Sequence, residues 1–390
     1  MSKKTSDRSV PEQVAYIATV YSHLAAFHLP FMEDLKHSGY VVHAYAGQDE
    51  RKAAVQEAGF ECRDLSFSRR PFALGNMKAL IQLVRVFRKE PYQLIHVHTP
   101  NAGVITRIAA CLAGAKNVVY TAHGFHFQRG GSLLGWLIYY PVEWMMALCT
   151  DRLITINSED DQQAKRFPVR GRCVYMPGGV GVDTHAFAET LGDEDRWATS
   201  TFTILCAAEL NCNKNQQQLI RSLHELIHTM NIPARLQLAG TGPEEDNYRR
   251  LAIELGVEDH VDFLGFRHDI PKLLAAADCL ALVSHREGLP KVLLEGLSAG
   301  KPLVVTDVRG SRDLVTSGEN GWVVPKDDVQ ATTAALQILY ADISLRKRMG
   351  HSSRERAEAY NLQSMRSRMQ ALYNELVGFS ARERGDAGNP

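Results

Sequence analysis

The sequence predicts an α/β protein built from two doubly wound parallel sheets, and three observations carry that prediction. The chain has 390 residues, about twice what one hydrophobic core usually organises. Short apolar runs alternate with helical segments along most of it, which is typical of parallel sheets with crossover helices. The alternation stops at residues 178–200, a stretch rich in Gly, Asp, Glu and Thr, and then restarts. We therefore expect two Rossmann-like units that bind ligands beyond the carboxyl ends of their strands.

Each element follows from the alternation of apolar runs and helical periods. The candidate strands of the first half are 14–20, 41–46, 94–97, 118–121, 153–156 and 173–176, separated by candidate helices at 29–37, 53–57, 77–88, 104–113, 137–149 and 160–166. The candidate strands of the second half are 202–207, 235–239, 261–264, 279–283, 302–306 and 321–324, again with helices between them. Each unit is therefore expected to hold six strands.

The same pattern gives the domain boundaries. We expect an N-terminal domain over 1–182, a linker over 183–200 and a C-terminal domain over 201–361. An amphipathic helix over 362–380 is expected to pack back toward the N-terminal domain. Residues 381–390 are expected to be a disordered tail.

Composition limits the classes of function. Hydrophobic residues at 45% and charged residues at 23% fit a globular protein, and a formal net charge of zero argues against a strongly basic nucleic-acid binder. The net charge is +6 over 1–182 and −6 over 183–390, which suggests that the first half binds an anionic partner. The alternative is that the asymmetry arose by chance. The seven cysteines lack metal-ligand spacing, which favours a reducing compartment. The first ten residues lack the apolar core of a signal peptide, and the apolar run 133–149 is interrupted by Pro141 and Glu143. We expect a cytoplasmic protein, with contact to a membrane surface left open.

The densest group of candidate site residues lies in 284–310. Glu287 follows a predicted strand, and the turn after it leads into a helix that carries Glu295. The turn consists of Gly288, Leu289 and Pro290, and Lys291 follows it. A helix N-terminus presents free N–H groups and a positive dipole end, which suit a diphosphate, and carboxylates there accept hydrogen bonds from sugar or ribose hydroxyls. The alternative, that both glutamates are ordinary solvent-facing residues, stays open.

Two further loops follow predicted strands of the second half. Gly240 and Gly242 end one strand, and glycine lets the backbone approach a ligand closely. The segment from Glu209 to Lys214 ends another, and its lysine can neutralise phosphate as a point charge. A plain turn and a solvated loop lysine are the alternatives.

Histidines cluster at two strand ends of the first half, in HVHTPN (96–101) and AHGFHF (122–127). They suit acid–base chemistry or zinc, but no cysteine or carboxylate stands at ligand spacing, so we expect no metal. We expect His96 to be structural and keep His123 as the functional candidate. The acidic triplet 159–161 is interpreted as a helix cap.

Together these segments resemble the retaining glycosyltransferases of family 4, which have the GT-B fold of two Rossmann-like domains facing each other across a cleft. The resemblance covers about residues 14–376, and its most specific element is the E-x(7)-E spacing of Glu287 and Glu295. The order of Lys214, GTGP, FLGFRHDIPKLLAAADC, EGLP and NGWVVP is also characteristic. The family usually carries an arginine five positions before the lysine, where this chain has Glu209, and a glycine-rich loop near the N-terminus is replaced by 22–30.

The resemblance implies roles for individual residues. Lys214 would bind the donor diphosphate, Glu295 the ribose, and Glu287 the transferred sugar. Gly240 and Gly242 would approach the nucleotide, with Glu209, Gly288, Leu289, Pro290 and Lys291 completing the donor site. His123 would position or polarise the sugar during front-face attack, whereas a double displacement would require Glu287 as its nucleophile. Lys214 and helix N–H groups would stabilise the leaving diphosphate, so no metal and no other cofactor is expected.

The segments FSRRP, IHVHTPNAGVITR, TAHGFHF and LITINSEDD resemble a bacterial subgroup that tolerates Glu at the arginine position. Its members build capsular, exopolysaccharide or glycoprotein glycans on polyprenyl-diphosphate carriers. The resemblance implies a UDP-sugar donor carrying a hexose or N-acetylhexosamine and a lipid-diphosphate-linked acceptor on the inner membrane face. The acceptor would meet five residues: Arg69, Arg70, His98, Thr99 and Asn101.

Two rival functions remain open at this point. One is a nucleotide-sugar epimerase of the same fold, and the other is a catalytically silent nucleotide-sugar-binding subunit, which Glu209 makes plausible. For the membrane contact, Arg85, Arg88 and Lys89 share one face of the helix 77–89, and the run 133–149 is rich in aromatic residues. The alternative is that this run is a core helix.

Overall fold

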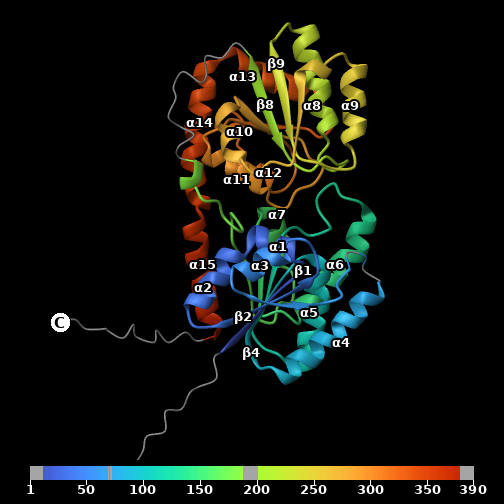
Figure 1. Ribbon diagram of the computed structural model, residues 1–390, viewed down its shortest axis with the longest axis vertical. Helices are drawn as coiled ribbons and strands as arrows, with labels where there is room; N and C mark the ends of the chain where they lie inside the picture. Colours follow the sequence, from blue (N-terminus) through green and yellow to red (C-terminus); the bar gives the residue numbers. More distant parts are fainter. Residues whose placement is uncertain (1–11, 69, 71–72, 188–200, 378–390) are drawn as a thin grey trace, which may run out of the picture. The chain divides into compact units, whose positions relative to one another are not determined.

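The computed structural model describes residues 12–68, 70, 73–187 and 201–377, which form two compact units (Figure 1). Unit 1 comprises the chain up to Thr155, Asp160–Met176 and the residues from Arg366 onward. Unit 2 comprises Ile156–Glu159 and Pro177–Met365. Residues 177–182, placed with the first domain by the sequence-based division, therefore belong to unit 2. Residues 188–200 of the expected linker and the expected tail 381–390 lie outside the described residues.

Unit 1 is built on a seven-stranded parallel sheet in the order β3-β2-β1-β4-β5-β6-β7. Its strands are β1 (Gln13–Val20), β2 (Val41–Gly47), β3 (Glu61–Asp64), β4 (Tyr92–His98), β5 (Val118–Ala122), β6 (Arg152–Thr155) and β7 (Arg172–Tyr175). The helices are α1 (Tyr21–Phe27), α2 (Leu29–His37), α3 (Lys52–Glu57), α4 (Leu74–Lys89), α5 (Pro100–Ala113), α6 (Leu133–Ala147) and α7 (Ser158–Ala164). The prediction of six strands is wrong here, because β3 is a short polar edge strand without an apolar run.

Unit 2 has the expected six parallel strands, in the order β10-β9-β8-β11-β12-β13. They are β8 (Phe202–Ala207), β9 (Ala234–Ala239), β10 (Val261–Gly265), β11 (Cys279–Leu282), β12 (Leu303–Thr306) and β13 (Gly321–Val324). The helices are α8 (Gln216–His224), α9 (Glu245–Glu254), α10 (Ile270–Ala276), α11 (Lys291–Ser298), α12 (Ser311–Leu314), α13 (Val329–Ala341) and α14 (Ile343–Ala357), with short helical turns η3 (Glu225–Thr229), η4 (Glu258–His260) and η5 (Glu358–Tyr360). The two predicted parallel α/β units are thus confirmed.

The central strands form because their residues are apolar on both faces. β5, β11 and β12 are buried along their whole length, as expected where helices cover both sides of a parallel sheet. The chain leaves β1 and β4 of unit 1, and β8 and β11 of unit 2, in opposite directions along the sheet. Such a reversal opens a crevice at the carboxyl ends of the two strands, where α/β proteins bind ligands.

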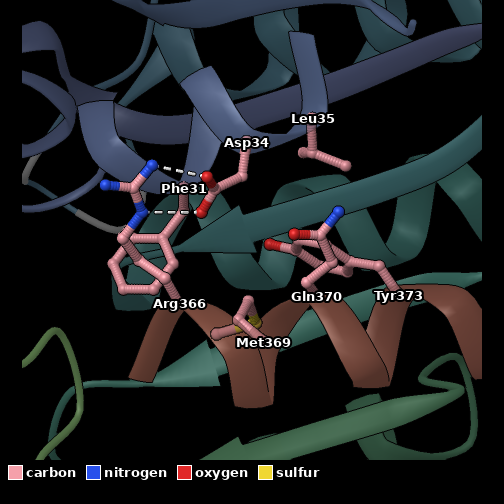
Figure 2. A pocket seen from close by; sticks show the side chains of 7 residues that line it. All are labelled: Phe31, Asp34, Leu35, Arg366, Met369, Gln370 and Tyr373. Atoms are coloured by element: carbon pink, nitrogen blue, oxygen red, sulfur yellow. Dashed lines mark hydrogen bonds and ion pairs between the residues drawn. The ribbon is translucent and has the colours of Figure 1, made fainter. Parts of the chain in front are cut away.

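The last helix, α15 (Leu362–Val377), completes unit 1 from Arg366 onward. Figure 2 shows Arg366 paired with Asp34 of α2 beside Phe31 and Met369. Further along the helix, the Tyr373 hydroxyl contacts His96 Nδ1 at 2.6 Å and Tyr16 in the interior of the unit. Leu35 and Gln370 complete the lining of a shallow depression between the two helices.

Candidate functional site

In unit 2, an ion pair joins the loop after β8 to the loop after β11. Lys214 Nζ lies 2.6 Å from Glu287 Oε1, although 73 residues separate the two in the sequence. Asn213 reinforces the connection, because its side chain donates to the Arg286 carbonyl and its own carbonyl accepts from His285 N–H. The Glu287 side chain is only 9% exposed, so Lys214 neutralises a nearly buried carboxylate.

The helix that follows, α11, carries Glu295 in its second turn. Pro290 is the extended N-cap residue at the end of the predicted turn, and the helix begins at Lys291. Lys291 Nζ lies 3.7 Å from Glu295 Oε1. Burial raises the pKa of the Glu295 carboxyl, and Lys291 opposes part of that shift. A Cβ on Gly296 would lie 2.5 Å from Leu280, so glycine lets α11 pack directly on the sheet and fixes where Glu295 lies.

The two predicted glycines lie where one backbone crosses another. A Cβ on Gly240 would be 2.0 Å from the Ala208 carbonyl oxygen, and one on Gly242 would be 2.2 Å from the Leu210 oxygen. Backbone hydrogen bonds from Ala208 and Leu210 join the loops after β8 and β9. Both glycines are therefore required for the contact between loops, whether or not a ligand approaches them. The side chain of Glu209, on the same β8 loop, is exposed.

Arg309 belongs to this region but escaped the sequence analysis. It follows β12, is 3% exposed, and donates through Nε to the Glu287 carbonyl at 3.0 Å. The next residue, Gly310, has φ +74°, and a Cβ there would collide with the Gly288 backbone. In the sequence, only an arginine followed by a glycine after a predicted strand was visible, and that pattern is too common to mark a site. The pair fixes the Glu287–Gly288 turn.

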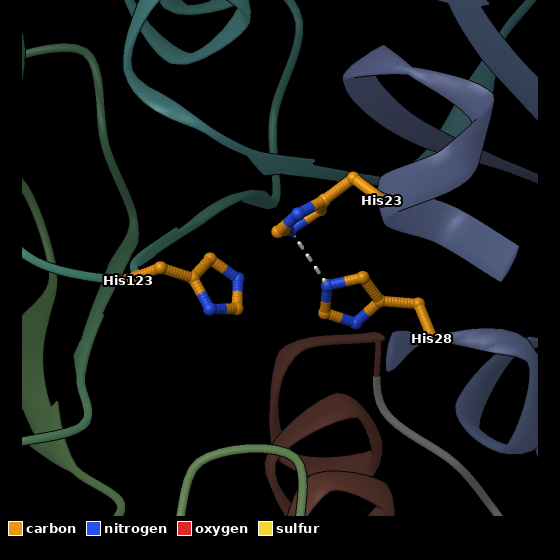
Figure 3. Close-up of side chains that lie close together, drawn as sticks. All are labelled: His23, His28 and His123. Carbon is orange, nitrogen blue, oxygen red and sulfur yellow. Dashed lines mark hydrogen bonds between the residues drawn. The ribbon is translucent and has the colours of Figure 1, made fainter. Parts of the chain in front are cut away.

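In unit 1, His123 lies in a group of five histidines at the carboxyl edge of the sheet. His23 comes from α1, His28 from the junction of α1 and α2, and His123 from the end of β5. Figure 3 shows these three rings turned toward one another, with His23 Nε2 and His28 Nε2 3.3 Å apart. The other members lie on β4: His98 stacks on His28 at 3.7 Å between ring centroids, and its Nδ1 lies 3.3 Å from His123 Nε2. His96 is structural, as predicted, since both its nitrogens are hydrogen-bonded inside the unit.

The five rings are uncharged at neutral pH because they are buried together. Burial lowers the pKa of His23 to about 4 and that of His96 to about 3. It also lowers the pKa of His28, His98 and His123 well below the usual value, and repulsion between neighbouring imidazoles adds to the effect. One nitrogen of each of His23, His28 and His123 lies within 4.8 Å of the others, so these three side chains could hold a metal ion.

The loops that carry the histidines are held by two unusual contacts. Thr99 has φ 68° and ψ 146°, a conformation that costs a β-branched residue about 1–3 kcal/mol. Its Oγ1 accepts from the Thr19 N–H at 3.0 Å and contacts the Thr19 hydroxyl at 2.7 Å, which ties β4 to β1. On the other side, the buried Asp160 carboxylate accepts from the Phe125 N–H at 3.1 Å. Asp160 lies in the first turn of α7, as the interpretation of 159–161 as a helix cap requires, and its carboxylate also positions the His123 loop.

Of the residues expected to contact the acceptor, only some lie close together. Arg69 lies outside the described residues, and Arg70 is exposed. Asn101 donates to the Ser68 carbonyl at 2.9 Å, which brings the Arg70 segment to the start of α5. His98 is fully buried behind His28 and His123, so it supports the group instead of facing solvent.

Helix α6 presents an exposed apolar face. Its single charged residue, Glu143, points inward and pairs with the buried Arg107 at 2.8 Å. Its large outward side chains are Leu133, Leu134, Leu137, Ile138, Tyr139, Trp144 and Met145, with exposed fractions from 37% to 81%. The exposed stripe of α4 begins with Leu74, Met77 and Ile81 and ends with Arg85 and Arg88. Among the described residues, no helix is both long and apolar enough to cross a bilayer. The alternative that 133–149 is a core helix holds for the inner face of α6, where Trp136, Tyr140 and Ala147 pack in the core of unit 1.

Sequence and structure comparisons agree with this architecture. The "Glycosyl transferase 4-like" family matches residues 13–157, and the "Glycosyl transferases group 1" family matches residues 189–356. The chain is 36% identical over 386 residues to the putative glycosyltransferase EpsD of Bacillus subtilis, covering 96% of this chain and 99% of that protein. It is 27% identical over 324 residues to an Escherichia coli enzyme named UDP-Gal:alpha-D-GlcNAc-diphosphoundecaprenol alpha-1,3-galactosyltransferase, covering 81% and 82% of the two chains.

Among solved structures, Anabaena HepE in complex with UDP and glucose matches with a TM-score of 0.75 at 19% identity, over 93% of this chain and 100% of that one. At this identity the likeness shows the fold, and the predicted GT-B class is confirmed. The EpsD relationship spans nearly the whole chain. The chain therefore belongs to the group 1 glycosyltransferases, with a 4-like domain in its first half.

Proposed function

We propose that this glycosyltransferase moves a hexose or N-acetylhexosamine from a UDP-sugar to a lipid-diphosphate-linked sugar, with retention of anomeric configuration, during assembly of a bacterial surface polysaccharide or glycan. The observation that carries the proposal is the Lys214–Glu287 pair at the carboxyl edge of the unit 2 sheet, beside the helix that holds Glu295. A cation next to a helix N-terminus fits a diphosphate, and nearby carboxylates fit sugar and ribose hydroxyls.

In the proposed donor site, the diphosphate replaces Glu287 as the ion-pair partner of Lys214. A diphosphate that reaches Lys214 competes with Glu287 for the ammonium group, so Glu287 becomes available to accept from the sugar hydroxyls. Glu295 accepts from the ribose. Negative charge grows on the leaving diphosphate in the transition state, and Lys214 stabilises it where it develops. We propose that no metal is required for this step.

The proposed transfer is a front-face substitution. The bond between the anomeric carbon and the diphosphate oxygen breaks, and its electron pair leaves with UDP. The acceptor hydroxyl oxygen bonds to the same face of that carbon, and its proton passes to the leaving phosphate oxygen. His123 is our candidate for positioning the sugar, because its uncharged ring can accept or donate a hydrogen bond without adding charge beside a cationic sugar.

The acceptor proposal rests on the relatives and on the surface of unit 1. The E. coli relative is named for a diphosphoundecaprenol-linked acceptor, and the capsular polysaccharide biosynthesis glycosyltransferase CapM of Staphylococcus aureus is 23% identical over 314 residues. An exposed α6 face without charge, and an α4 stripe that runs from apolar to basic, suit the interface of an anionic bilayer. We propose that these two helices hold the enzyme on the inner membrane face, with Arg70 near the acceptor diphosphate.

The test of the function is direct. Purified protein, treated with EDTA, is incubated with a panel of UDP-sugars and a short-chain polyprenyl-diphosphate N-acetylglucosamine, and products are separated by mass spectrometry. We expect a lipid-linked disaccharide whose new linkage keeps the donor's configuration by NMR. An epimerised nucleotide sugar without transfer would support an epimerase, and binding alone would support a silent subunit. Loss of transfer after EDTA would contradict metal independence.

The membrane contact has its own test. In the double variant Leu134→Glu/Leu137→Glu, both side chains are more than half exposed, so the fold should persist. We expect wild-type protein to sediment with vesicles that contain anionic lipid and the double variant to remain largely in solution. Ile253→Glu, at an equally exposed apolar position of unit 2, is the matched control. Equal, negligible sedimentation of all three proteins at low and high salt would overturn the membrane proposal and favour a soluble acceptor.

A further inference from the structure

Three histidine side chains of unit 1 converge, and no Asp, Glu or Cys among the described residues joins them as a further ligand. His23, His28 and His123 come from separate parts of the chain, and one nitrogen from each lies within 4.8 Å of the other two (Figure 3). His28 is 3% exposed, whereas His23 and His123 retain partial access to solvent. The group therefore combines a buried floor with an open side through which a small ion can enter.

The distances within the group approach those of a metal centre. Nitrogens bound to Zn²⁺ at about 2.0–2.1 Å in tetrahedral geometry lie about 3.3–3.4 Å apart. His23 Nε2 and His28 Nε2 are 3.3 Å apart, so this pair already has the required separation. The third nitrogen must move inward by at most about 1.5 Å to reach the same geometry.

The chemistry of the ligands selects the kind of ion. Imidazole suits zinc, copper, iron and nickel, whereas magnesium and calcium prefer oxygen ligands. Three histidines with one open position are the ligand set of many catalytic zinc sites. Since the three ligands are neutral, the ion keeps its double positive charge and attracts water or an anionic oxygen to the fourth position.

We propose that His23, His28 and His123 form a binding site for a first-row transition metal ion, with zinc as the natural occupant. Occupancy takes the lone pair of His123 and prevents the ring from accepting a hydrogen bond from the sugar, so the ion inhibits transfer reversibly. The binding site stands independently of the enzyme's reaction, and only the inhibitory consequence rests on the proposed function.

Binding is measured first, without substrates. Tag-free, full-length protein is stripped with EDTA, dialysed and titrated with ZnCl₂ by calorimetry, and Co²⁺ absorption reports the coordination geometry. We expect one zinc ion per chain and cobalt bands of tetrahedral intensity. Since even a lost second-shell partner weakens metal binding about 10–100-fold, His23→Gln and His123→Gln should each weaken zinc binding at least about 100-fold.

The matched control removes a histidine from elsewhere in the chain. The rings of His224 and His228 lie 4.9 Å apart in unit 2 and form a second candidate for casual metal binding. His228→Gln should leave zinc affinity unchanged. The proposal is overturned if wild-type protein shows no binding at micromolar zinc, if His23→Gln and His123→Gln bind as wild type does, or if His228→Gln removes the binding. Circular dichroism of each metal-free variant verifies the fold, and the two ligand variants are independent of each other.

The inhibitory consequence is then tested with active enzyme. Zinc should inhibit wild-type transfer and EDTA should restore it, while His23→Gln should stay active and at least tenfold less sensitive to zinc. Zinc binding without inhibition would keep the metal site and reject its effect on His123. Absence of transfer under every condition would reject the proposed function and leave the calorimetric result standing.

Discussion

At the carboxyl edge of its sheet, unit 2 presents paired charges, whereas unit 1 presents a group of uncharged rings. Lys214 and Glu287 neutralise each other across two loops, and Lys291 lies near Glu295. The five grouped histidines at the edge of the unit 1 sheet have depressed pKa values, and His28 and His98 stack against each other. The contrast teaches that one topology supports two kinds of site: charges that can exchange partners with an anionic ligand, and neutral rings that orient hydrogen bonds.

The largest expected effect comes from removing the cation of unit 2. Lys214→Ala should lower kcat roughly 100-fold or more while changing the KM for the donor much less, because its charge matters most in the transition state. Steady-state kinetics measure both constants, and circular dichroism checks the fold, since Glu287 loses its partner. Lys272→Ala, at an exposed lysine of α10, is the control. Normal turnover in Lys214→Ala would make Lys214 an ordinary loop lysine.

The next largest effect is expected in the histidine group of unit 1. His123→Asn should lower kcat about 100-fold and leave UDP binding unchanged, because the ring acts on the sugar and not on the nucleotide. His126→Asn removes the exposed histidine three positions later, which packs on Tyr139, and should retain wild-type turnover. Wild-type kinetics in His123→Asn would confine the histidine group to structure and metal binding.

A smaller effect concerns nucleotide affinity. Glu295→Ala should weaken UDP binding about tenfold or more, since a hydrogen bond to a charged group contributes about 1.5–3 kcal/mol. Isothermal titration calorimetry measures the UDP affinity. Glu254→Ala, at an exposed glutamate of α9, is the control. Unchanged affinity in a folded variant would remove Glu295 from the donor site.

The same carboxylate predicts a pH dependence. Burial raises the Glu295 pKa, so as the pH falls its carboxylate is protonated earlier than an exposed glutamate. The difference in UDP affinity between wild type and Glu295→Ala should therefore be largest at neutral pH and shrink on mild acidification. UDP itself also titrates, but it does so equally in both experiments. The difference in affinity between wild type and Glu295→Ala therefore reports only the protein. A difference that stays constant down to the ordinary glutamate pKa would contradict this role.

The smallest effect is expected at Glu209, which stands where the family usually has an arginine. Its side chain is exposed, so Glu209→Arg should leave the melting temperature unchanged. An added cation near the diphosphate should improve UDP affinity about two- to fivefold, the usual range of an exposed charge pair. Abolished transfer would instead give Glu209 a role of its own.

The sequence predicts the parts of the fold whose signal is local. β5, β11 and β12 are buried apolar runs and were predicted almost to the residue. α1 was missed because it follows β1 without a break and its N-cap Val20 makes no side-chain cap bond. His23 and His28 were missed with it, whereas His96, His98 and His123 of the same group were identified as clustered at strand ends.

The site of unit 2 was more predictable than that of unit 1. Glu287 and Glu295 stand at a fixed spacing around a strand-to-helix turn, so their positions are set locally. Lys214 reaches Glu287 only because β8 and β11 are neighbours in the sheet, a relation that strand order decides. Arg309 and Asp160 act through the backbone of distant loops, and neither carries a spacing that marks it.

The return of α15 to unit 1 has a consequence for synthesis on the ribosome. Unit 2 is nearly continuous in the sequence, ending at Met365, and can fold while the chain is still being made. Unit 1 is synthesised first but lacks the residues from Arg366 onward until unit 2 has been synthesised as well. Until then His96 lacks the Tyr373 hydroxyl, and Asp34 lacks Arg366. Of the two units, the one synthesised first is thus completed last, and a chain truncated before Arg366 is left with an incomplete unit 1.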